Sequence, residues 1–90
     1  MRRAAKVDAN QGAIVAALRK AGATVQHLHT VGDDCPDLLI GYRSHNYIIE
    51  VKIPGEKMRD GQIEWMQNWR GSAHIAHSVD EALRAIGAMK

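Results

Sequence analysis

Two short apolar runs on either side of a polar turn constrain the fold of this 90-residue chain more than any other feature. Residues 35–42 read CPDLLIGY, residues 47–52 read YIIEVK, and the polar residues 43–46 lie between them. Apolar runs of about 4–8 residues bounded by turn residues are typical of two strands that pair as a β-hairpin. The chain is therefore expected to build a β-sheet around this hairpin.

The register of the hairpin determines which polar side chains lie together. A turn centred between residues 44 and 45 pairs Leu39 with Glu50 and Asp37 with Lys52. Opposed residues, and residues two apart on a strand, share a face, so Asp37, Glu50 and Lys52 are predicted on one side. Asp37 and Glu50 become diagonal neighbours with Cα atoms roughly 7–8 Å apart. A turn with one extra residue would place Asp37 on the other face, so this prediction depends on register.

Size and composition predict one domain spanning residues 1–90, with no disulfide. The single cysteine, Cys35, has no partner, which indicates a reducing compartment, and no apolar run has the ~18–20 residues of a membrane span. A net charge of +2 does not by itself indicate a nucleic-acid binder. The basic residues nevertheless form two groups, which are either solvated surface or phosphate contacts: Arg2, Arg3 and Lys6 near the N-terminus, and Lys52, Lys57 and Arg59 after the hairpin.

Periodicity along the chain predicts the order α-β-β-β-α-β-α. Two helices have clear boundary signals: Gly22 ends the first, and Ser78 with Glu81 forms a capping box for the last. Either Asp8 or Asn10 would cap the first helix. This order predicts an α/β domain in which helices flank a mixed sheet. The predicted elements are helices at 8–21, 60–70 and from 79 onward, and strands at 24–29, 35–42, 47–52 and 73–77.

The second helix carries one unexpected polar residue. Gln62, Trp65 and Trp69 recur at helical spacing and share a stripe, and the two tryptophans are expected in the core. Gln62 would aim an amide along that apolar stripe. Its side chain either points to water from the first helical turn or takes part in a functional site, and the pattern alone does not separate the two.

Two carboxylates on one face of a sheet need compensation. At about 5 Å and an effective dielectric near 20, their repulsion is roughly 3 kcal/mol. The structural explanation is a surface ion pair of Asp37 with Lys52, contributing about 0–1 kcal/mol. Against it, Glu50 lies within an apolar strand, where burial without a partner is costly. Oxygen ligands of this kind favour Mg²⁺ or Mn²⁺, and the absence of CxxC and HxxxH spacing argues against zinc.

These residues resemble a known nuclease signature. Pro36-Asp37, followed by Glu50-Val51-Lys52 with thirteen positions from Asp37 to Glu50, is similar to the PD-(D/E)XK motif. With a helix before it and Gln62 on a helix after it, the chain resembles the stand-alone VRR-NUC (virus-type replication-repair nuclease) domains over nearly its whole length. Asp8 and Gln11 match the spacing of an acidic residue and a glutamine on the first helix of that family.

The resemblance implies a restriction-endonuclease-like fold and Mg²⁺- or Mn²⁺-dependent hydrolysis of DNA. It implies a metal held by Asp37, Glu50, the Val51 carbonyl and Asp8, with Lys52 as the catalytic lysine and Gln62 supporting it. The implied partners are branched DNA, such as Holliday junctions or flaps, and a second copy of the chain; no membrane and no small-molecule cofactor are expected. The expected location is the cytoplasm of a bacterial or phage-infected cell.

Two departures from the family pattern leave alternatives open. Asp8 is one methylene shorter than the usual glutamate, and Asp34 stands where a glycine is common. Both would weaken catalysis, and the added charge of Asp34 would oppose an approaching phosphate. The alternatives are therefore a DNA-binding module that keeps the nuclease fold without its activity, or a structural protein whose polar cluster consists only of ion pairs.

Overall fold

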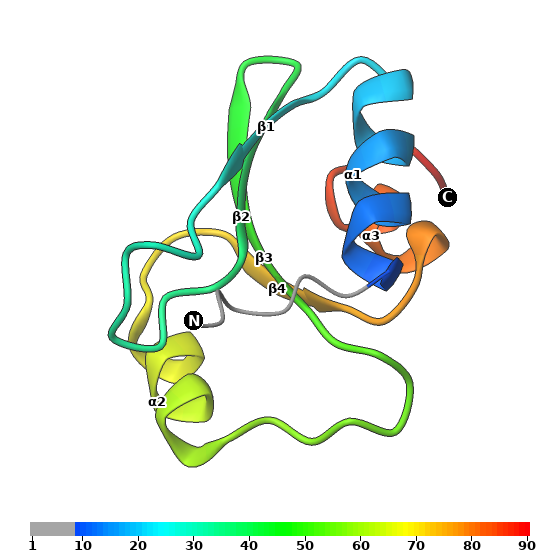
Figure 1. Cartoon of the computed structure of the whole chain (residues 1–90). Helices are drawn as coiled ribbons and strands as arrows, with labels where there is room; N and C mark the ends of the chain where they lie inside the picture. The colour runs from blue at the N-terminus through cyan, green and yellow to red at the C-terminus, as the bar shows by residue number, and fades with distance from the viewer. Residues whose placement is uncertain (1–8) are drawn as a thin grey trace.

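A computed structural model describes residues 9–90, and its elements follow the predicted order. Three consecutive strands follow the first helix, and a second helix precedes the fourth strand, as Figure 1 shows. Relative to the predictions, the first strand ends two residues earlier and the second helix stops before Arg70. The elements are α1 (Ala9–Lys20), β1 (Thr24–His27), β2 (Leu38–Tyr42), β3 (His45–Val51), α2 (Asp60–Asn68), β4 (Ala73–Ala76) and α3 (Val79–Ala85).

The four strands form one mixed sheet in the order β1-β2-β3-β4. β1 pairs with β2, and β2 with β3, in antiparallel orientation, whereas β3 and β4 run parallel. A parallel pair requires a crossover, and here the loop 53–59 and α2 supply it. The predicted fold class, an α/β domain with a mixed sheet flanked by helices, is confirmed.

The hairpin turn is shorter than the sequence suggested, and the predicted register was wrong by two residues. Tyr42 pairs with His45, so only Arg43 and Ser44 form the turn, with φ of 51° and 68°. Two central residues with positive φ match a type I′ turn, whose twist suits a hairpin but which usually carries Asn-Gly. Leu39 pairs with Ile48 instead of Glu50. Because the shift is even, every side chain keeps its predicted face.

The apolar core lies between the sheet and two helices. α1 and α3 cover one face of the sheet, as Figure 1 shows, and the apolar side of each strand points toward them. The opposite face is open along much of its length, where Leu39 and Ile75 remain 37% exposed. The largest fully buried side chains are Ile14, Leu18, Pro36, Leu38, Ile40 and Ile49.

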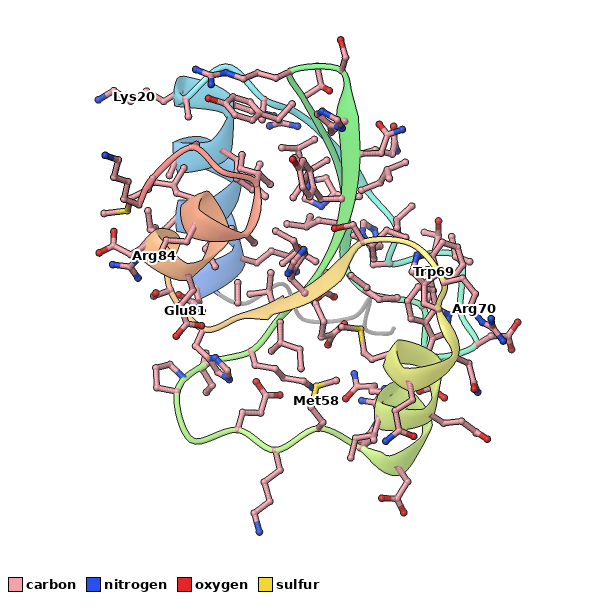
Figure 2. All side chains as sticks on the ribbon, turned by 180° about the vertical axis from the view of Figure 1, so that it is seen from behind. Lys20, Met58, Trp69, Arg70, Glu81 and Arg84 are labelled. Atoms are coloured by element: carbon pink, nitrogen blue, oxygen red, sulfur yellow. The ribbon has the colours of Figure 1, made fainter. Side chains whose placement is uncertain are left out.

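α2 does not join this core, and the prediction that Trp65 and Trp69 are core residues was wrong. The two rings stack at 4.6 Å between centroids, and Trp69 is 45% exposed. In Figure 2, Trp69 lies on the side of the molecule away from α1 and α3. Gln62 is the one residue of α2 that is buried. The reason is position: α2 sits at one end of the open sheet face, so its first turn contacts the sheet while its last turn faces solvent.

Helix boundaries follow the predicted signals. Gly22, with φ of +103°, directs the chain away from α1, and its N–H donates to the carbonyl of Arg19 at 3.0 Å. Ser78 caps α3 by accepting a hydrogen bond from the N–H of Glu81 at 3.1 Å. The Glu81 carboxylate accepts from the N–H of His77, one residue before the cap, so only half of the predicted capping box forms.

Candidate metal centre

Asp37 lies at the entrance to β2, opposite the end of β3. One residue beyond the last ladder pair, Leu38 with Ile49, Asp37 comes opposite Glu50. Its Oδ2 accepts a hydrogen bond from the backbone N–H of Val51 at 2.8 Å. The neighbouring Pro36 is fully buried and fixes the chain just before this carboxylate. Asp37 is therefore anchored to the strand that carries Glu50, on the open face of the sheet.

Glu50 is a buried carboxylate whose charge is disfavoured by its surroundings. It is 5% exposed, and its Oε2 accepts a hydrogen bond from Nε2 of Gln62 at 3.0 Å. Burial, and next the charge of Asp37, raise the pKa of Glu50 from its usual 4.5 to about 7, although Lys52 and Arg59 act in the opposite direction. A cation beside this pair would offset both causes.

Lys52 directly follows β3 and is also buried. It is 4% exposed, and its Nζ lies 3.5 Å from Oε2 of Glu50 and 3.5 Å from Oε2 of Glu56. Its backbone is held as well, because its N–H donates to the carbonyl of Ala76 at 3.0 Å and its carbonyl accepts from the side-chain amide of Asn10 at 3.2 Å. Asn10 therefore links α1 to the site; it lies within α1 and is not the predicted cap.

Gln62 joins α2 to Glu50, so its side chain does not point to water as one of the two interpretations had it. Its Oε1 accepts a hydrogen bond from the N–H of Arg59 at 3.0 Å, and its Nε2 donates to Glu50. One amide therefore caps the first turn of α2 and holds the buried carboxylate. The side chain is 7% exposed and does not point to water.

Glu56 is the site residue that sequence reasoning missed. Residues 53–56 form a turn in which the N–H of Glu56 donates to the carbonyl of Ile53 at 3.0 Å and Gly55 has a φ of +87°. Proline followed by glycine at the two central positions is typical of a type II turn. The dipeptide Pro54-Gly55 was a sequence signal for this turn, and the turn brings the Glu56 carboxylate back toward Lys52.

Arg59 and Asp34 form an ion pair at the mouth of the site. The Nη2 of Arg59 lies 3.2 Å from Oδ1 of Asp34. Asp34 adopts a left-handed φ of 61°, and Gly61 leaves the space that its carboxylate occupies, since a Cβ there would overlap it. Asp34 therefore adopts a backbone conformation that glycine favours, and its carboxylate packs against the start of α2.

Several predicted site residues lie outside the described part of the chain or stand apart from the cluster. Arg2, Arg3, Lys6 and Asp8 fall outside residues 9–90. Lys57 is exposed on the loop 53–59, and Met58 points from that loop toward the sheet in Figure 2. Gln11 is buried on α1. The structure thus brings together Asp37, Glu50, Lys52 and Gln62, from the start of β2, the end of β3 and the first turn of α2.

Comparison with known families, curated proteins and solved structures finds no match. Among residues 9–90, no helix is long and apolar enough to cross a membrane. Within the same residues, no group of three or more His, Cys, Asp or Glu side chains is arranged to hold a metal ion.

The donor set of this pair fits a hard divalent cation. Both side chains are carboxylates, which suit Mg²⁺ and Mn²⁺ better than softer metals. Burial and the charge of Asp37 raise the pKa of Glu50 despite Lys52 and Arg59, so a divalent cation beside it would lower the cost of ionising this carboxyl group. Mg²⁺ sites commonly use one or two carboxylates and keep several waters, so two protein ligands are enough for a site of this kind.

Proposed function

We propose that this protein is a metal-dependent DNA endonuclease of the VRR-NUC type within the PD-(D/E)XK nucleases. The observation that carries the proposal is the buried carboxylate of Glu50, placed opposite Asp37 and contacted by both Lys52 and Gln62. These are the four residues that the PD-(D/E)XK resemblance assigns to the site. Burial and the charge of Asp37 raise the pKa of Glu50 to about 7, and a perturbed carboxylate beside a second carboxylate and a lysine supports a functional site.

The proposed chemistry is hydrolysis of a phosphodiester bond. Asp37, Glu50 and the Val51 carbonyl would hold the Mg²⁺ or Mn²⁺, with Asp8 as a further ligand, and the ion would supply a water of lowered pKa. Lys52 orients the attacking water and stabilises negative charge on the phosphate. Gln62 holds Glu50 in place through its hydrogen bond. By resemblance, cleavage breaks the P–O3′ bond and leaves a 5′-phosphate.

The proposed DNA contacts are the exposed cations near this site. Lys57 and Arg59 lie on the segment between β3 and α2, and the N-terminal Arg2, Arg3 and Lys6 are further candidates. Binding through phosphates releases counterions, so affinity would fall steeply as salt rises. Arg59 already forms an ion pair with Asp34, so a phosphate would have to compete with the Asp34 carboxylate for its guanidinium group.

Replacing Asp34 by asparagine is expected to tighten DNA binding. The variant removes the carboxylate that pairs with Arg59, while an amide can still contact the guanidinium as a neutral acceptor. Because the pair is exposed, the expected gain is small, about two- to fivefold in Kd at low salt. Fluorescence anisotropy with a labelled DNA at two salt concentrations measures it, with Asp80→Asn on α3 as the charge-matched control. Equal affinity in Asp34→Asn and wild type would show that Asp34 does not restrict Arg59.

A homodimer acting on branched DNA in the cytoplasm completes the proposal. One 90-residue chain offers one metal centre and cuts one strand at a time. Two centres related by a two-fold axis would cut opposed strands of a symmetric branch.

The proposal is tested by cleavage of nicked, forked and four-way DNA with Mn²⁺, comparing wild type with Lys52→Met. Methionine keeps an unbranched apolar side chain of similar length in the buried position and lacks the ammonium group. Wild type is expected to cut at least one substrate, and Lys52→Met to be at least about 100-fold slower. DNA that is shifted on a gel but left intact by wild type would favour the binding module. Equal activity of the two proteins would remove Lys52 from the mechanism.

A further inference from the structure

The ammonium group of Lys52 has two carboxylate partners, and only one of them belongs to the proposed metal centre. Glu50 approaches it from β3, and Glu56 approaches it from the loop 53–59, each with an oxygen 3.5 Å from Nζ. Lys52 is 4% exposed, so water cannot readily replace a lost partner. If Glu50 binds a metal ion, the position of the Lys52 ammonium group therefore depends on its contact with Glu56.

Glu56 is held in place independently of Lys52. Its Oε1 accepts a hydrogen bond from the N–H of Ile53 at 3.0 Å, while its Oε2 faces Nζ of Lys52. The turn Ile53-Pro54-Gly55-Glu56 fixes the backbone beneath it, through the hydrogen bond from the N–H of Glu56 to the carbonyl of Ile53. One oxygen anchors the side chain and the other is directed at the lysine.

A divalent cation at Asp37 and Glu50 would weaken the contact of Lys52 with Glu50. The same Oε2 of Glu50 accepts from Gln62 and faces Lys52, so a cation would compete for that charge and repel the ammonium group. The cation would not compete for Glu56 in this way, because Glu56 lies on the turn and not on β3 beside Glu50. Glu56 would therefore keep the Lys52 ammonium group in the site when Glu50 binds the metal ion.

We propose that Glu56 is a positioning residue that holds Lys52 at the metal centre during hydrolysis. The inference rests on the proposed nuclease function, in which Lys52 acts on the attacking water. Misplacement of a catalytic group by about 1 Å can lower a rate 100-fold. Because burial itself restricts the Lys52 side chain, we expect loss of the Glu56 charge to lower the cleavage rate by less than about 100-fold. Glu56 acts through Lys52 and does not itself contact DNA, so it affects the chemical step and not substrate binding.

The test compares Glu56→Gln with Glu64→Gln in single-turnover cleavage at saturating Mn²⁺. Glutamine keeps an acceptor for the N–H of Ile53 and loses the charge that faces Lys52. Glu64 is an exposed carboxylate of α2, so its variant removes one charge without touching Lys52. We expect Glu56→Gln to lower the maximal rate about tenfold with a KM for DNA within twofold of wild type, and Glu64→Gln to change neither. Thermal unfolding checks that each variant is folded, and Glu56→Ala repeats the test without an amide.

Each result bears on the inference in a different way. An active wild type with an equally active Glu56→Gln and Glu56→Ala would overturn the role of Glu56 and leave the nuclease proposal intact. A rise in KM alone, or the same loss in Glu64→Gln, would assign the effect to general electrostatics and also overturn it. A wild type that cuts no DNA would overturn the proposed function, and this inference with it.

Discussion

Asp37→Asn is expected to lower Mn²⁺-dependent cleavage by about 100- to 1,000-fold while leaving the fold intact. Asparagine can still accept the hydrogen bond from the N–H of Val51, which anchors Asp37 in the structure. It cannot supply the negative charge that a divalent cation needs. The loss should therefore come from metal binding and not from unfolding.

Two measurements separate these causes for Asp37→Asn. Without metal, circular dichroism should match wild type and thermal unfolding should show no loss of stability, because the backbone contact is kept and a repulsion with Glu50 is removed. The rise in unfolding temperature that Mn²⁺ gives to wild type should disappear in the variant. Asp80→Asn, an exposed position in the first turn of α3, is the matched control and should behave as wild type. A variant that still cleaves and is still stabilised by Mn²⁺ would show that Asp37 is not a ligand.

Glu50→Gln is expected to stabilise the metal-free protein at pH 8 and to have little effect at pH 4. The pKa of Glu50 is about 7 in the folded protein and 4.5 in its usual state, so the folded protein binds this proton more tightly than the unfolded chain. Its contribution to stability is full below pH 4.5 and is lost as the pH rises through 7. Removing the charge should recover about 1–2 kcal/mol at pH 8, allowing for solvent screening.

Urea unfolding in EDTA at pH 4, 6 and 8 measures this effect. Wild type should lose unfolding free energy between pH 4.5 and 8, and Glu50→Gln should lose less over the same range. Mn²⁺ should reverse the order, because it binds the ionised carboxylate and displaces the proton. It should therefore stabilise wild type more at pH 8 than at pH 6, and Glu50→Gln at neither. Parallel pH profiles for the two proteins would contradict the assignment of the raised pKa to Glu50.

Local sequence pattern was enough to predict most of the sheet, but it was not enough to predict the register of the hairpin. Alternation of side chains places Asp37, Glu50 and Lys52 on one face for any even shift of register, so the cluster could be predicted without the correct turn. The turn itself could not, because Arg43 and Ser44 carry none of the Asn-Gly signal of a type I′ turn. Tertiary pairing of the strands determines the turn here, against the local preference.

The surroundings of the cluster depend on where α2 sits, which sequence pattern does not specify. Helical spacing puts Gln62 and the tryptophans on one stripe, but only the first turn of α2 reaches the sheet. Gln62 is therefore buried against Glu50 while Trp69 is exposed. Pro54-Gly55 signals only that the chain turns before Glu56, because the contact with Lys52 also depends on the side-chain conformation of Glu56.

The most direct test of the central claim is cleavage of an end-labelled four-way junction by wild-type protein across a Mn²⁺ titration. The proposed metal centre predicts no product in EDTA and a cleavage rate that rises with Mn²⁺ to a plateau. It also predicts that Mg²⁺ can replace Mn²⁺, and that the new ends carry a 5′-phosphate that a ligase can join. Cleavage that persists in EDTA, or a junction that is bound but uncut at every Mn²⁺ and Mg²⁺ concentration, would contradict the claim.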